Sequence, residues 1–168
     1  VYSIVNPNRF DENNNLKHLA SVGITFLFCI ALRRKLRVNN YYSKNNFIEH
    51  NLTIFLDLVA LGTICDVVSL KNLNRAFVKK GMQIIQKRIN KGITSLIDIS
   101  KIRNIPTVQD LSHVIGPKLN AGSRIGDSKI SSKLLFSNDS LEIDSISKKI
   151  NLFNEKRKLI ENNILFNA

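Results

Sequence analysis

Apolar residues recur at intervals of three and four along most of this chain, the spacing that places them on one face of a helix. Polar, asparagine-rich stretches at residues 11–15 and 39–50 separate the apolar segments. The pattern predicts helices over residues 19–37, 52–61, 74–90, 94–99, 107–115, 128–136 and 139–168, and a short strand over residues 1–5. We therefore expect a predominantly α-helical chain.

Two local signals refine these boundaries. Thr107 and Asp110 have the spacing of a capping box at the start of a helix. Gly116-Pro117 is expected to stop that helix, because proline lacks an N–H and its ring clashes with the preceding turn.

The last segment predicts one long helix of about 40 Å at 1.5 Å per residue. Its apolar stripe is interrupted only by Arg157 and comprises Ile143, Ile146, Ile150, Phe153, Ile160 and Ile164. We expect a partner surface to cover this stripe.

The chain has 168 residues, of which 43% are hydrophobic, enough for one core of ordinary size. Its formal net charge of +12 favours a polyanionic partner, nucleic acid first and an anionic membrane second. An AT-rich genome would also enrich lysine, so charge alone is weak support. The cations of residues 33–37 could contact phosphates or could form a solvated helix end.

Cys29 and Cys65 lie in apolar surroundings without ligand-like spacing, so we expect reduced thiols in a cytoplasmic protein. The longest apolar segment, residues 22–32, is too short to span a bilayer. We expect no membrane association.

Two carboxylates, Asp57 and Asp66, interrupt the apolar run of residues 56–70. A buried carboxylate requires compensation, which a metal ion, a helix N-terminus or a nearby arginine could supply. In an unbroken helix the nine-residue separation places the two on opposite faces. Both could serve one site only if the helix breaks, and Gly62-Thr63 is where we expect a break. Asp66 is the preferred metal ligand and Asp57 the less favoured one.

A second block, residues 116–127, combines three glycines at 116, 122 and 126 with side chains that can donate to a phosphate. These donors are Lys118, Asn120, Ser123 and Arg124. The pattern predicts a phosphate-binding loop, although a glycine-rich turn between helices would explain it equally well.

The run from Asp57 to Leu70, followed by Asn74-Arg75, resembles the fourth motif of the DHH phosphoesterases in the form found in the RecJ exonucleases. Residues 116–124 resemble the later RecJ motif written G-P-R-x-N-A-A-G-R. Asn6-Pro7-Asn8 precedes both blocks in the expected order. Lys118 stands where that family has arginine, and Ser69 where it usually has proline.

The resemblance implies an α/β fold in which residues 1–138 form the C-terminal, mainly helical part of a DHH domain. Residues 139–168 would be the connector helix toward a DHHA1 domain. It also implies hydrolysis of single-stranded DNA from 5′ to 3′ with two divalent ions, Mn²⁺ or Mg²⁺, in DNA repair and recombination. Asp66 would then be catalytic, and Arg75 and the donors of residues 116–124 would contact DNA.

The other DHH motifs, which carry the remaining metal ligands, are not found in this sequence. We therefore expect an internal piece of such an enzyme, inactive alone, whose missing ligands could come from a separate chain. The alternatives are a DHH phosphoesterase for short oligonucleotides or cyclic dinucleotides, and a non-catalytic basic remnant that binds nucleic acid through charge.

Overall fold

The computed structural model describes residues 3–11, 14–125 and 127–167, and every regular element within these ranges is a helix. The elements are α1 (Ser21–Val38), α2 (Tyr41–Lys44), the 3₁₀ turn η1 (Leu52–Phe55), α3 (Leu56–Cys65), α4 (Asn72–Gln86), α5 (Lys91–Ile99), α6 (Val108–Asp110), the π-helical turn η2 (Leu111–Ile115), α7 (Gly116–Ile125), α8 (Ile130–Phe136) and α9 (Ser140–Asn167). The predicted helical character is confirmed.

The strand predicted over residues 1–5 is wrong for residues 3–5, which have no regular structure. Residues 1 and 2 lie outside the described residues, as does Gly126.

Helix α3 is the centre of the packing. Its sequence is apolar on nearly every side, and a helix of this kind has to be surrounded by other elements. Val59 packs with Phe26 and Phe77 in a smaller core between α1, α3 and α4. Ala60 and Ile64 belong to a larger core that also includes residues of α4, α5, η2, α8 and α9.

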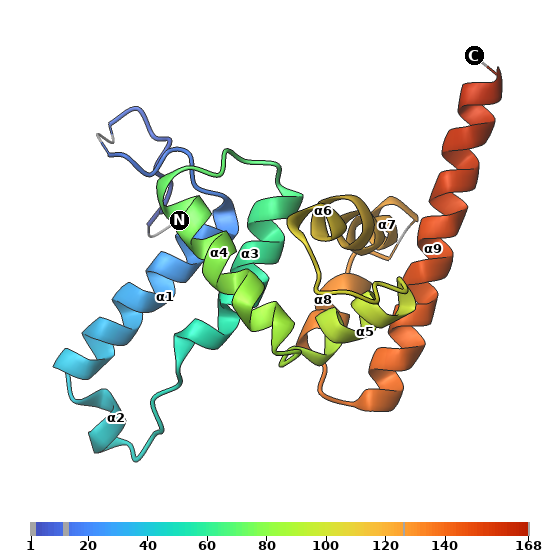
Figure 1. Cartoon of the computed structure of the whole chain (residues 1–168). Helices are drawn as coiled ribbons and strands as arrows, with labels where there is room; N and C mark the ends of the chain where they lie inside the picture. Colours follow the sequence, from blue (N-terminus) through green and yellow to red (C-terminus); the bar gives the residue numbers. More distant parts are fainter. Residues whose placement is uncertain (1–2, 12–13, 126, 168) are drawn as a thin grey trace.

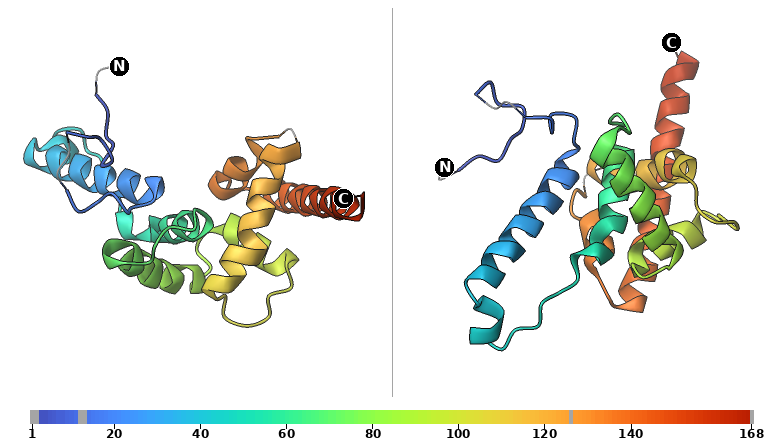
Figure 2. Two further views of the ribbon diagram at one scale, coloured as in Figure 1. Left: turned by 90° about the horizontal axis from the view of Figure 1, so that it is seen from above. Right: turned by 60° about the vertical axis from the view of Figure 1, so that its left-hand side comes forward.

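Figure 1 shows α3 and α4 beside each other in the middle of the molecule, with α1 on one side and α9 on the other. The views in Figure 2 also place α1 and α9 at opposite sides of this central pair. The order of the helices in space therefore follows from α3, which contacts α1 and α4 as well as η2 and α7.

Helix α9 has a covered half and an exposed half. Ile143, Ile146 and Ile150 are buried in the larger core, whereas Ile160 and Ile164 are 55% and 62% exposed. Figure 1 shows the C-terminal half extending beyond the rest of the fold. This chain therefore supplies the predicted partner surface for only the first half of the stripe.

The predicted loop over residues 116–127 is wrong in conformation, because residues 116–125 form helix α7. Gly116-Pro117 does not stop the chain, which passes directly from η2 into α7. Proline normally clashes with the carbonyl four residues earlier. The wider π-helical turn η2 ends at Ile115, two residues before Pro117, and relieves that clash, since its hydrogen bonds span one residue more.

The predicted break at Gly62-Thr63 is also wrong. Helix α3 continues to Cys65, and the backbone N–H of Asp66 donates to the carbonyl of Gly62 at 2.9 Å. The hydroxyl of Thr63 donates to the carbonyl of Val59 at 2.7 Å, so this buried polar group is satisfied within the helix. A helix enclosed on all sides gains nothing from a break that would expose backbone groups to apolar neighbours.

Both cysteines are free thiols, as predicted. None of the described helices is long and apolar enough to cross a membrane.

We predict that Gly81→Ala destabilises the fold by about 1–3 kcal/mol, because a Cβ at this position would lie 2.1 Å from the carbonyl oxygen of Leu56 and 2.4 Å from the Cβ of Ala60. Gly23→Ala is the matched control, since its Cβ would meet nothing closer than 3.5 Å. The control should gain about 0.5–1 kcal/mol from the better helix propensity of alanine. Urea unfolding followed by circular dichroism measures both, and equal effects would contradict the close α3–α4 contact.

Candidate functional site

Asp66 is the C-cap residue of α3 and its side chain lies on the surface. Because α3 is unbroken, Asp57 and Asp66 lie on opposite faces of it, as predicted for that case. The structure therefore does not bring the two carboxylates together. Of the two, Asp66 is the exposed one and can contact a ligand.

The electrostatics at Asp66 favour a cation. The C-terminal end of a helix carries a partial negative charge, so a carboxylate there is in an unfavourable place. Within the ranges that the structure describes, the Asp66 side chain has no hydrogen bond or ion pair. A cationic ligand would relieve this local excess of negative charge.

The residue after Asp66 is strained. Val67 has φ 54°, in the left-handed region that a β-branched residue rarely adopts. Its side chain is 84% exposed, so packing does not explain the choice of valine. Val67 directly follows the C-cap of α3, where a left-handed residue commonly ends a helix, and Arg88 and Lys101 adopt the same conformation after α4 and α5. This turn fixes the direction in which the chain leaves Asp66.

A small hollow of about 130 Å³ lies beside the end of α3. We call it the α3–α7 hollow, and its lining residues are Cys65, Ser112, Gly116, Pro117, Asn120, Arg124 and Arg157. The ends of α3 and α7 are in close contact here, since a Cβ on Gly116 would lie 2.8 Å from the Sγ of Cys65. Cys65, which precedes Asp66, thus lines the α3–α7 hollow together with Asn120 and Arg124, two of the predicted phosphate-binding residues.

Helix α7 presents three of the predicted donors on one face. Asn120, Ser123 and Arg124 are all exposed, and their spacing of three and four groups them together. The Ser123 hydroxyl donates to the carbonyl of Asn120 at 3.0 Å. The guanidinium of Arg124 is 60% exposed and lies 4.0 Å from Glu161, a distance that leaves most of its donors available.

Lys118 is buried, in contrast to the other donors. Its ammonium donates to the side-chain oxygen of Asn151 on α9, and burial lowers its pKa. The side chain joins α7 to α9 inside the fold. This position does not fit the phosphate contact that the sequence predicted.

Arg75 is exposed on α4, and the residue before it organises the turn after Asp66. Asn74 is fully buried, and its side-chain amide donates to the carbonyl of Ser69 at 3.0 Å and to that of His18 at 2.8 Å. Asn74 therefore holds the chain between α3 and α4 in place.

Arg157 is the functional candidate that the sequence did not identify. Its side chain is 19% exposed, lines the α3–α7 hollow, and forms an ion pair with Glu161. The sequence feature that could have identified Arg157 is its position within the apolar stripe of α9, because a charge within such a stripe needs a local partner.

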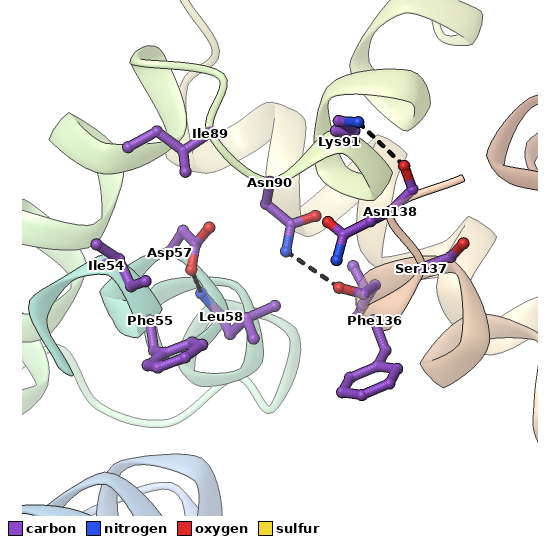
Figure 3. Close-up of a pocket in the computed structure, with 11 residues that line it drawn as sticks. Ile54, Phe55, Asp57, Leu58, Ile89, Asn90, Lys91, Phe136, Ser137 and Asn138 are labelled. Atoms are coloured by element: carbon purple, nitrogen blue, oxygen red, sulfur yellow. Dashed lines mark hydrogen bonds between the residues drawn. The ribbon is translucent and has the colours of Figure 1, made fainter. Parts of the chain in front are cut away.

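Asp57 lies on another face, in a pocket of about 330 Å³ between η1, α3, α5 and α8. Figure 3 shows its carboxylate beside the backbone N–H of Leu58, with the side chains of Ile54 and Phe55 nearby. That N–H donates to the carboxylate at 2.6 Å. Only 3% of Asp57 is exposed, and burial raises its pKa. Asp57 is thus a helix N-terminal carboxylate, one of the alternatives to a metal ligand.

The residues present do not make up a metal centre. Within the described ranges there is no group of three or more histidine, cysteine, aspartate or glutamate side chains that could hold an ion. Asp66 alone can offer one carboxylate to a site completed by other donors.

No family model matches the chain. Individual proteins match most of it. It is 35% identical over 161 residues to the single-stranded-DNA-specific exonuclease RecJ of Dickeya dadantii, covering 95% of this chain and 28% of that protein. It is 36% identical over 162 residues to RecJ of Haemophilus influenzae, with the same coverage. The chain belongs to the RecJ family.

The structural comparison agrees with this assignment. The crystal structure of RecJ from Thermus thermophilus in complex with Mn²⁺ matches with a TM-score of 0.66 and 26% identity, over 76% of this chain and 19% of that chain. A second structure of the same RecJ contains Mg²⁺. The chain spans about 28% of the length of the curated RecJ relatives that it matches.

We predict that Val67→Gly raises the free energy of unfolding by about 1 kcal/mol. The left-handed conformation costs an L-residue about 1–2 kcal/mol, which glycine avoids. Part of this gain is offset because glycine loses more chain entropy on folding. Val68→Gly is the control, as its φ is not positive, and it should lower stability. Urea unfolding measures both variants. A loss of stability in Val67→Gly would contradict the strain.

We predict that Asp57→Asn changes how stability depends on pH. The raised pKa means that the folded state binds a proton more tightly than the unfolded state. The parent chain should therefore lose stability as the pH rises from the ordinary aspartate pKa through the raised one, and the variant should not. The measurement is the difference in unfolding free energy across this range. Asp144→Asn, an exposed substitution, is the control, and a pH-independent difference for Asp57→Asn would contradict burial as the cause.

Proposed function

We propose that this chain is the section of a RecJ-type, 5′-to-3′ single-stranded-DNA exonuclease that contributes one metal-binding carboxylate and the surface that holds the strand. The observation that carries the proposal is the α3–α7 hollow. In it Cys65, which precedes Asp66 at the end of α3, lies with Asn120 and Arg124 of α7. A carboxylate that can bind a cation and a guanidinium that can bind a phosphate are groups that phosphodiester hydrolysis requires.

Each residue has a distinct role in this proposal. Asp66 is one ligand of a divalent ion, Mn²⁺ or Mg²⁺, whose other ligands come from the remaining DHH motifs. Arg124 and Asn120 hold a backbone phosphate at the hollow, with Ser123 beside them. Arg75 contacts the strand on the other side of the turn. Lys118 positions α7 against α9, because its ammonium is buried on Asn151.

The larger domain would have an α/β fold, of which residues 1–138 are the helical C-terminal part. Residues 139–168, mostly α9, would connect it to a second domain. The exposed apolar half of α9 supports this role, since that half has no cover among the described residues.

Single-stranded DNA is a better supported substrate than cyclic dinucleotides or other small phosphodiesters. The relatives that match nearly the whole chain are all single-stranded-DNA-specific exonucleases. The net charge of +12 also suits a long polyanion.

The test uses the purified chain with 5′-labelled single-stranded DNA and Mn²⁺. We expect binding without release of mononucleotides, because one carboxylate cannot assemble a two-metal site. Metal-dependent release that Asp66→Ala abolishes would overturn the expected inactivity.

The same experiment measures binding for Arg124→Ala. We expect weaker binding and a salt dependence reduced by about one phosphate contact. Arg37→Ala is the matched control, because it removes the same charge from a side chain that is 57% exposed on α1. Equal effects of the two substitutions would favour binding through overall charge and would overturn the role of the hollow.

A further inference from the structure

Helix α4 carries a ridge of cations beside the proposed site. Lys71 precedes the helix, Arg75 and Lys79 lie within it, and Lys87 follows it, each exposed and all at multiples of four residues. We call these four residues the α4 ridge. A step of four residues rises by about 6 Å and turns by about 40° around the axis, so Arg75 and Lys79 are neighbours on the surface of α4, with Lys71 at its N-cap and Lys87 just beyond its C-terminal end.

The ridge faces solvent because the other side of α4 is fixed in the core. Phe77, Val78 and Gly81 are buried against α3 and its neighbours. Figure 1 shows α4 crossing in front of α3. The orientation of the ridge is thus set by the same packing that positions Asp66.

No acidic residue compensates this charge. Residues 71–87 include Lys80 as well as the ridge and contain no aspartate or glutamate. Within the part of the chain that the structure describes, none of the four ridge side chains has an ion pair or a hydrogen bond.

Several other exposed cations of the described residues are paired, although Arg34, Lys35 and Lys44 of α1 and α2 are not. Arg37 pairs with Glu49 and Arg88 with Asp98, while on α9 Lys148 pairs with Asp144. An uncompensated line of like charges is unfavourable for the isolated fold, and an anionic partner removes that cost.

The first ridge residue follows Asp66 closely in the sequence. Only four residues separate Asp66 from Lys71, and α4 then leads away from the end of α3. A strand held at the α3–α7 hollow has to continue past this turn or leave the protein. The cations of α4 supply a row of phosphate contacts in one of the available directions.

We infer that the α4 ridge is a second contact surface for single-stranded DNA, which binds the sugar-phosphate backbone beyond the hollow without reading sequence. This inference rests on the proposed function for the identity of the ligand. Because the contacts are to phosphates, they require a strand longer than the hollow can hold. The ridge therefore determines the affinity for long strands rather than for short ones.

The test compares oligothymidylates of about 4 and about 16 nucleotides, which bracket the site sizes of single-strand binding modules. The ridge variant combines Lys71→Gln, Arg75→Gln and Lys79→Gln in the full chain. The matched control combines Arg34→Gln, Lys35→Gln and Lys44→Gln, which removes the same charge from exposed cations of α1 and α2.

We expect the ridge variant to lose about tenfold or more in affinity for the long strand and little for the short one. Its salt dependence should fall by about 2, since each phosphate contact on a single strand contributes about 0.7. The control should bind both strands nearly as the parent chain does. Lys71→Arg with Lys79→Arg should retain the parent affinity, which separates a charge contact from a folding defect.

Equal losses in the ridge variant and the control would overturn the inference, as would a parent chain that binds both lengths equally. The role of the α3–α7 hollow is tested separately, by measuring the affinity of Arg124→Ala for the short strand. An unchanged affinity there, together with a ridge-dependent loss on the long strand, would refute the hollow and support the ridge. The opposite pattern would support the hollow and refute the ridge.

Discussion

Helix α3 has almost no polar face, and this constraint shapes the rest of the protein. A helix of that kind exposes apolar surface on whichever side is left open, so α1, α4, η2 and α7 all pack against it. The contact with α4 is the tightest of those described, because the backbone of Gly81 lies against Leu56 and Ala60. Most of α3 is buried, and Asp66 lies exposed at its C-terminal end.

The position of Asp66 connects packing with chemistry. A carboxylate at the negative end of a helix, followed by a strained valine, is poorly placed for stability. In the proposed function this cost is exchanged for a fixed carboxylate that meets a cation. The π-helical turn η2 contributes in a similar way. It accommodates Pro117, so α7 can begin beside Cys65 and bring Arg124 to the same depression.

The two aspartates of the apolar run show how the same side chain takes different roles in different surroundings. Asp57 is enclosed near a helix N-terminus, accepts a backbone hydrogen bond and has a raised pKa. Asp66 is exposed at the opposite end of the same helix. Lys118 and Arg124 form a second such pair within one motif, one buried on Asn151 and the other facing solvent.

The sequence by itself determined the helical character, the capping box at Thr107, the separation of the two aspartates in an unbroken helix, and the family. These follow from local spacing and from motifs, which are written along the chain. Tertiary structure decided that α3 does not break at Gly62, that residues 116–125 are helical, and that Lys118 is buried while Arg157 lines the hollow. Those outcomes depend on which surfaces meet, because burial can override the local preference of a glycine or a proline and can enclose a charge when a partner such as Asn151 is at hand.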